Sequence, residues 1–272
     1  VNCLRNTAIG FQAMSVGSTH DPQDSVAIGY RALQGLNDGD RNVAIGAYAG
    51  KSITTGQENM MMGKSALLSL TTGSQNVAIG QSAMSSADGA ESYNIAIGHQ
   101  SMNLVNNDSA TYNVALGYQS LQNVQTEGNV GIGRQALQSL TSGGSNTAIG
   151  YTTSQYNATG TNNTSLGYES LRGVSGNNHS HNTAIGAGSQ KFVTTGSDNS
   201  SLGKNSLRNV TTGSSSVIIG SDAGAAITTT NNMVIIGKSA GTSINHNNAE
   251  GGTYIGYEAG KAITSGGHNT VL

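Results

Sequence analysis

A short sequence pattern recurs along the whole chain and limits its fold more than any other feature. The pattern is Asn-Thr-Ala-Ile-Gly at residues 146–150 and its variants, and the glycine returns after 16 to 19 residues, most often 17. Each unit of such an array contacts mainly its neighbours, so the repeat outweighs the one or two globular domains that 272 residues would suggest. Fifteen complete copies end at Gly10, Gly29, Gly46, Gly63, Gly80, Gly98, Gly117, Gly133, Gly150, Gly167, Gly186, Gly203, Gly220, Gly237 and Gly256.

A sixteenth copy begins at Asn269 and stops at Leu272. We expect a single repeat array over residues 1–272. Because both ends fall inside the repeat, we also expect it to be a fragment of a longer chain.

The residues before each glycine predict a short β-strand. Counting from the glycine, position −1 is aliphatic or Met in every complete copy, position −2 is mostly Ala, position −3 is mostly β-branched, and position −4 is Asn in eleven of fifteen. Successive side chains of a strand face opposite sides. Val and Ile therefore share one face, and Asn, Ala and Gly share the other. Both faces are apolar or small, which favours burial of both.

This alternation predicts a coil core and a partner surface. We expect the side chains at −1 to form the repeat core: Ile9, Ile28, Ile45, Ile79, Ile97, Leu116, Ile132, Ile149, Leu166, Ile185, Leu202, Ile219, Ile236 and Ile255. Each coil then buries only about three large aliphatic side chains, and so thin a scaffold needs a partner. We expect a homotrimer about a threefold axis, with a monomeric solenoid as the alternative. Its interface would be the alanines at −2: Ala8, Ala27, Ala44, Ala78, Ala96, Ala115, Ala148 and Ala184.

The residues after each glycine form the rest of the coil. Position +3 is small, +4 is often Leu or Met and +7 is mostly aliphatic, as in residues 135–140. This spacing suits one or two helical turns, and a second strand with a bulge is the alternative. Thr-Thr-Gly-Ser at 71–74, 194–197 and 211–214 is typical of turns. The sequence thus predicts a mainly β fold, a parallel β-solenoid or β-roll of about fifteen coils, each a short strand plus a tight bend or short helical turn.

At these residues the chain resembles known fibre proteins. Ser-Val-Ala-Ile-Gly at 25–29 and Asn-Val-Ala-Ile-Gly at 42–46 and 76–80 are similar to the head repeats of YadA-type trimeric autotransporter adhesins. The longer unit, with its Thr-Thr-Gly-Ser turn, resembles repeats of phage tail fibres. The resemblance implies parallel coils in trimers, and a place on a virion fibre or a cell surface.

Two sets of side chains are candidate binding residues. His179 and His181 alternate as two ligands on one strand face would, so three chains could surround a metal ion, although an exposed polar loop is the simpler explanation of the pair and the one we favour. Aromatic residues recur at +1, and exposed rings could stack on cell-surface sugars or else pack on neighbouring coils. The candidates for surface binding are Tyr30, Tyr118, Tyr151, Tyr168 and Tyr257.

Composition narrows the function classes. The net charge of −2 is scattered, so nothing indicates nucleic acid as a partner, and no apolar run is long enough to predict membrane insertion. We find no pattern typical of a catalytic triad or a phosphate loop, and we expect neither enzyme activity nor a cofactor. The primary hypothesis is a structural shaft or head of an extracellular homotrimeric fibre that supports attachment to a host surface. Two alternatives are an adhesin head that binds glycans or matrix through edge loops and the tyrosines, and an ice-binding solenoid.

Overall fold

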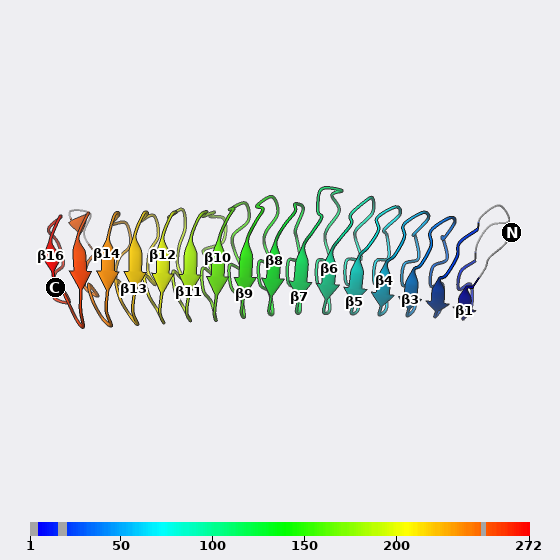
Figure 1. Cartoon of the computed structure of the whole chain (residues 1–272), viewed down its shortest axis with the longest axis horizontal. Helices are drawn as coiled ribbons and strands as arrows, with labels where there is room; N and C mark the ends of the chain where they lie inside the picture. The colour runs from blue at the N-terminus through cyan, green and yellow to red at the C-terminus, as the bar shows by residue number, and fades with distance from the viewer. Residues whose placement is uncertain (1–4, 16–20, 246–248) are drawn as a thin grey trace. The chain divides into compact units, whose positions relative to one another are not determined.

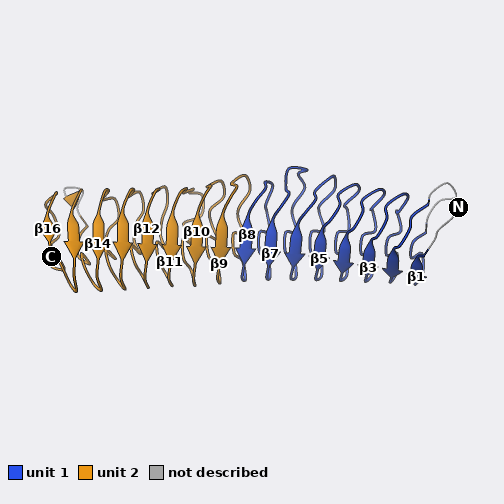
Figure 2. Cartoon of the chain, viewed as in Figure 1, with its two compact units in different colours: residues 1–135 blue, residues 136–272 orange. Residues whose placement is uncertain are grey.

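The chain folds into short parallel strands joined by turns, in two compact units. The computed structural model of the protein describes residues 5–15, 21–245 and 249–272. In these ranges it is a β-solenoid of sixteen strands with no α-helix (Figure 1). Unit 1 comprises residues 1–135 and unit 2 comprises residues 136–272 (Figure 2). The predicted β-solenoid is therefore confirmed.

Among the described residues, each unit has eight strands that pair in sequence order with matched register. In unit 1, for example, Ala27 pairs with Ala44 across β2 and β3. The strands of unit 1 are β1 Thr7–Ile9, β2 Val26–Ile28, β3 Val43–Ile45, β4 Met60–Met62, β5 Val77–Ile79, β6 Ile95–Ile97, β7 Val114–Leu116 and β8 Val130–Ile132. Those of unit 2 are β9 Thr147–Ile149, β10 Thr164–Leu166, β11 Thr183–Ile185, β12 Ser200–Leu202, β13 Val217–Ile219, β14 Val234–Ile236, β15 Thr253–Ile255 and β16 Thr270–Val271. The incomplete sixteenth copy thus forms β16.

The wall opposite the strands consists of turns rather than helix or strand. Positions +2 and +4 have left-handed backbone angles, such as φ 59° at Ser65 and 48° at Leu67. Their N–H groups point in opposite directions along the stack. Ser65 N donates to Ala47 O at 2.9 Å in the preceding coil, and Leu67 N donates to Ala83 O at 3.0 Å in the following coil. An α-helix would keep these bonds within its own segment, whereas alternating turns bond each coil to both neighbours.

The glycine that ends each repeat is required by crowding between coils. Gly46 has φ 132°, which side chains of L-residues rarely adopt. A Cβ atom on Gly46 would lie 2.7 Å from the carbonyl carbon of Gly63 in the next coil. At Gly46 the two backbones therefore approach too closely for a side chain. Gly256 meets no such backbone, but its φ of 131° also favours glycine.

Buried asparagines at −4 form a ladder of hydrogen bonds from coil to coil. Asn59 N donates to Asn42 Oδ1 at 3.0 Å, and Asn59 Nδ2 donates to Gly73 O at 2.9 Å. Asn59 Oδ1 in turn accepts from Asn76 N at 3.0 Å. Where the ladder reaches Ser25, the hydroxyl oxygen takes over and accepts from Asn42 N at 3.1 Å. The ladder satisfies polar backbone groups in a core that water does not reach.

The burial of the strands reverses the two faces expected from the sequence. The predicted interface residues Ala27, Ala44, Ala78, Ala96, Ala115, Ala148 and Ala184 are fully buried within the chain, so they cannot contact another copy, while Ala8 in the terminal strand is exposed. The predicted core residues lie on the outer face. Ile28, Ile45, Ile79, Leu116, Ile132, Ile185 and Ile236 are half-buried, and Ile9, Ile97, Ile149, Leu166, Leu202, Ile219 and Ile255 are exposed. The actual core combines the small residues at −2 with the side chains at +3, +4 and +7, as in Ala66, Leu67 and Leu70.

The narrow space between strand and turns explains this reversal. Coils with Ala at −2 mostly carry Leu or Met at +4, whereas Ile235 at −2 occurs with Gly241 at +4. A Cβ atom on Gly241 would lie 2.9 Å from Ile235 Cδ1. Two other coils also combine a large residue at −2 with glycine at +4: Ile218 with Gly224, and Tyr254 with Gly260. The larger residues at −2 therefore fill the interior of their own coils.

Candidate interaction surfaces

The outer side of the sheet of unit 1 is apolar and partly exposed. Positions −3 and −1 of β2 to β8 are Val, Ile, Leu or Met in every strand, and none is fully buried. Met60 and Ile95, for example, are 42% and 39% exposed. We call these side chains the outer aliphatic face of unit 1. A contiguous apolar patch of this kind is typical of interaction sites rather than of free surface.

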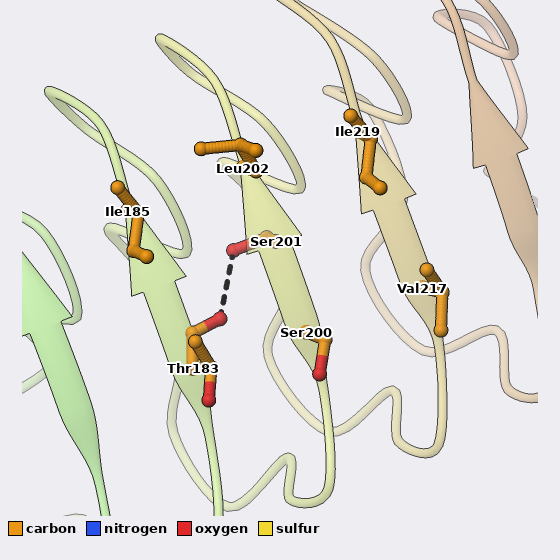
Figure 3. Close-up of a pocket in the computed structure, with 7 residues that line it drawn as sticks. All are labelled: Thr183, Ile185, Ser200, Ser201, Leu202, Val217 and Ile219. Carbon is orange, nitrogen blue, oxygen red and sulfur yellow. Dashed lines mark hydrogen bonds between the residues drawn. The ribbon is translucent and has the colours of Figure 1, made fainter.

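The corresponding face of unit 2 is more polar at one edge. Position −3 carries hydroxyl residues in four successive strands, at Thr147, Thr164, Thr183 and Ser200. Because the Ser200 side chain is small, it leaves a depression of about 100 Å³ between Leu202 and its neighbours on β11 and β13. Figure 3 shows the lining residues Thr183, Ile185, Ser200, Ser201, Leu202, Val217 and Ile219. The depression is shallow, apolar and without charged groups, which suits packing against another apolar side chain.

The aromatic residues at +1 mostly stack on one another. Phe11 and Tyr30 are parallel with ring centroids 5.7 Å apart, and Tyr151 and Tyr168 are parallel at 5.6 Å. Tyr118 stacks on the His99 ring at 5.5 Å and also contacts the Arg134 guanidinium at 5.7 Å. A ring that packs on its neighbours has less face to offer a sugar. Among the predicted binding residues, Tyr257 is the most exposed, at 71%.

A second hollow in unit 2 is charged. It has a volume of about 170 Å³, and its lining comprises Tyr168, Glu169, Ala187, Gly188, Lys191, Lys204, Asn205 and Arg208. It forms because the middle one of three successive coils carries Ala187 and Gly188, where its neighbours carry larger side chains. We call it the Ala187 pocket. The sequence analysis did not predict this pocket. Its signal was a pair of small residues, Ala187 and Gly188, at positions +1 and +2, where the preceding coil has Tyr and Glu and the following coil has Lys and Asn.

The histidines predicted as metal ligands do not converge. His179 is 2% exposed, inside the coil, and neither ring nitrogen has a hydrogen-bond partner in the structure. Burial lowers the pKa of His179 to about 4, so the ring is neutral at pH 7. His181 lies on the surface, with its Nε2 3.3 Å from Asn162 Nδ2. The geometry therefore does not support a shared metal ion. In the described part of the chain, no three His, Cys, Asp or Glu side chains cluster as metal ligands would.

The enlarged turns are tied to neighbouring coils rather than free. Ala90 N donates to Asp108 Oδ1 at 2.8 Å, which joins the turns at 88–92 and 106–110 in unit 1. In unit 2, Asn178 Oδ1 accepts from Thr159 N at 2.8 Å. Residues 245–250 between β14 and β15 lie partly outside the described residues. These contacts give the turns defined conformations.

Comparison with known proteins found no relative of this chain. No protein-family model, curated protein or solved structure matches the chain. Within the described ranges no helix has the length and apolar character needed to cross a membrane.

Proposed function

We propose that the chain is a structural segment of an extracellular fibre, on a virion or a cell surface, in which identical copies pack through their outer aliphatic faces. The observation that carries this proposal is the unbroken row of half-exposed Val, Ile, Leu and Met side chains on β2 to β8. The role is mechanical, holding an attachment function away from the particle or cell. Self-association through the −3 and −1 positions replaces the alanine interface expected from the sequence.

The size of the face supports a stable contact. At roughly 60 Å² exposed per aliphatic side chain, the strands β2 to β8 offer roughly 800 Å², which equals the contribution of each partner in an interface of standard size. Charged residues are absent from the face in these strands. Removal of this area from water would stabilise an assembly by the hydrophobic effect.

The repeat also favours a second copy over an unrelated partner. Parallel strands recur about every 4.8 Å, so only a chain with the same spacing matches this face coil for coil. A face that is two side chains wide fits a closed arrangement about an axis, most simply three copies. The resemblance of the Asn-x-Ala-Ile-Gly repeats to trimeric adhesins and phage fibres points the same way.

Light scattering after size exclusion tests the proposal. Three chains of 27.6 kDa would give 3 × 27.6 = 82.8 kDa. The double substitution Ile45→Lys and Ile79→Lys places two charges on the face, and we expect it to yield folded monomers. Gln75→Lys adds a charge at an exposed position outside the face and serves as the control. A wild-type chain that is folded by circular dichroism and monomeric at every concentration would overturn the proposal.

A further inference from the structure

We propose that the Ala187 pocket binds a saccharide that carries a carboxylate, with its cations holding the acid group and Tyr168 holding the sugar ring. The pocket lies entirely within unit 2 of one chain. Its test is therefore independent of self-association and of the fibre proposal.

Positively charged side chains are concentrated around the pocket. The chain has a net charge of −2, yet Lys191, Lys204 and Arg208 line the pocket, and Arg172 is paired with Glu169 of its lining. Glu169 pairs with two of them, at 2.6 Å from Lys191 Nζ and 3.0 Å from Arg172 Nη1. Its charge is therefore already balanced.

Two of these cations have no such partner. Lys204 and Arg208 form no ion pair with any residue that the structure describes. Asp222, an acid in the following coil, accepts a hydrogen bond from Asn205 Nδ2 at 3.0 Å. Lys204 and Arg208 are thus available to a carboxylate, which an arginine binds well through paired hydrogen bonds.

The Arg208 guanidinium is held in place by an aromatic ring. The Arg208 guanidinium carbon lies 5.1 Å from the centroid of the Phe192 ring, and Lys191 Nζ lies 5.3 Å from the same centroid. Stacking on an aromatic ring restricts the guanidinium before any ligand arrives. Arg208 is half-buried, so solvent screens its charge less than it would on a free surface, whereas Lys204 is exposed.

One face of the Tyr168 ring is open to the pocket. One side of the Tyr168 ring stacks on Tyr151. The next residue along the +1 row is Ala187, whose methyl group is too small to cover the other side, and Tyr168 lines the pocket there. A sugar ring can pack on such a face through its C–H groups. Tyr118, which contacts a ring and a guanidinium, has no comparable opening.

The side-chain oxygen of Asn205 supplies a polar atom in the same pocket as the open Tyr168 ring. A Cβ atom on Gly188 would lie 2.7 Å from Asn205 Oδ1, so this oxygen approaches the space that the glycine leaves open. It offers an acceptor for a sugar hydroxyl group. Cations, an aromatic face and an amide oxygen around about 170 Å³ fit one acidic monosaccharide unit better than a bare inorganic anion.

Titration calorimetry with three probes separates the contributions. Sodium glucuronate carries both ring and carboxylate, methyl glucoside carries only the ring, and sodium acetate carries only the carboxylate. We expect glucuronate to bind at least about 10-fold more tightly than either of the others, and more weakly as salt is raised. Lys204→Gln and Arg208→Gln should each weaken glucuronate binding about 10-fold.

Matched variants identify the pocket. Lys238→Gln makes the same change at the +1 position two coils away and should leave glucuronate binding unchanged. Ala187→Tyr keeps every charge but covers the free face of Tyr168, and should abolish binding without lowering the unfolding temperature. The proposal is overturned if glucuronate binds no better than acetate, or if Lys238→Gln weakens binding as much as Lys204→Gln does.

Discussion

The asparagine ladder makes a quantitative prediction at Asn59. Asn59→Ala removes the acceptor of the Asn76 N–H and the donor to the Gly73 carbonyl. Both groups are buried, and each buried polar group without a partner costs about 1–3 kcal/mol. We therefore expect the substitution to lower the free energy of unfolding by about 2–6 kcal/mol. Urea denaturation followed by circular dichroism measures this change, at fixed protein concentration because assembly would contribute to stability.

The fold contains its own control for this prediction. Ser25 occupies the same position in its coil, and its hydroxyl still accepts from the next backbone N–H. Asn59→Ser should keep the bond that Asn76 N donates and lose those that Asn59 Nδ2 donates to Gly73 O and Asn42 Oδ1. Asn42 Oδ1 still accepts from the backbone N–H of residue 59, so only the Gly73 carbonyl is left without this partner, at a cost of about 1–3 kcal/mol. Two results would contradict a stabilising role for the ladder. One is an equal decrease of the urea midpoint in Asn59→Ala and Asn59→Ser, and the other is a loss of less than about 0.5 kcal/mol in the free energy of unfolding of Asn59→Ala.

Three further predictions address the backbone, the buried histidine and the two faces. Gly46→Ala should prevent native folding or cost several kcal/mol, because φ is 132° and the Cβ atom would meet Gly63; the yield of folded protein and the urea midpoint measure this. The pKa of His179 is about 4 in the folded state, below its unfolded value near 6.5, so stability should fall by about 3 kcal/mol as pH drops from 6.5 to 4. His179→Leu should flatten that dependence in thermal unfolding. Leu67→Ala should destabilise the fold by about 2–5 kcal/mol, whereas Ile79→Ala, at a half-buried position, should destabilise a single chain less than Leu67→Ala does and should also weaken assembly.

Much of the architecture could be predicted from the repeat. The returning glycine gave the number of coils, and the β-branched residues before it gave the strands, including the incomplete last copy that forms β16. The segment 135–140 was different, because its side-chain spacing is also compatible with a helix. Backbone angles that alternate in sign leave no mark in a hydrophobic pattern. Only the bonds to both neighbouring coils show why turns are preferred.

The interaction surfaces were less predictable, because they depend on which residues are adjacent in space. Tyr168 was a candidate from its position in the repeat. Its open face follows from Ala187 in the next coil, and the free charge of Arg208 follows from the pairing of Glu169 with Lys191 and Arg172. Each of these residues is unremarkable in the sequence. The pocket exists because coils of unequal size lie side by side.

The sequence by itself determined the repeat, the parallel strands, the required glycine and the alternation of two faces. The tertiary structure alone decided which face is inside. Period-two alternation is symmetric between inside and outside, and both Ala and Ile are apolar enough to be buried. The narrow gap between strand and turns resolves this, since it admits Ala44 or Ala78 opposite the turns but has no room for an isoleucine unless a glycine faces it, as Gly241 does for Ile235. The larger aliphatic side chains are left on the surface, where a second copy of the chain could cover them.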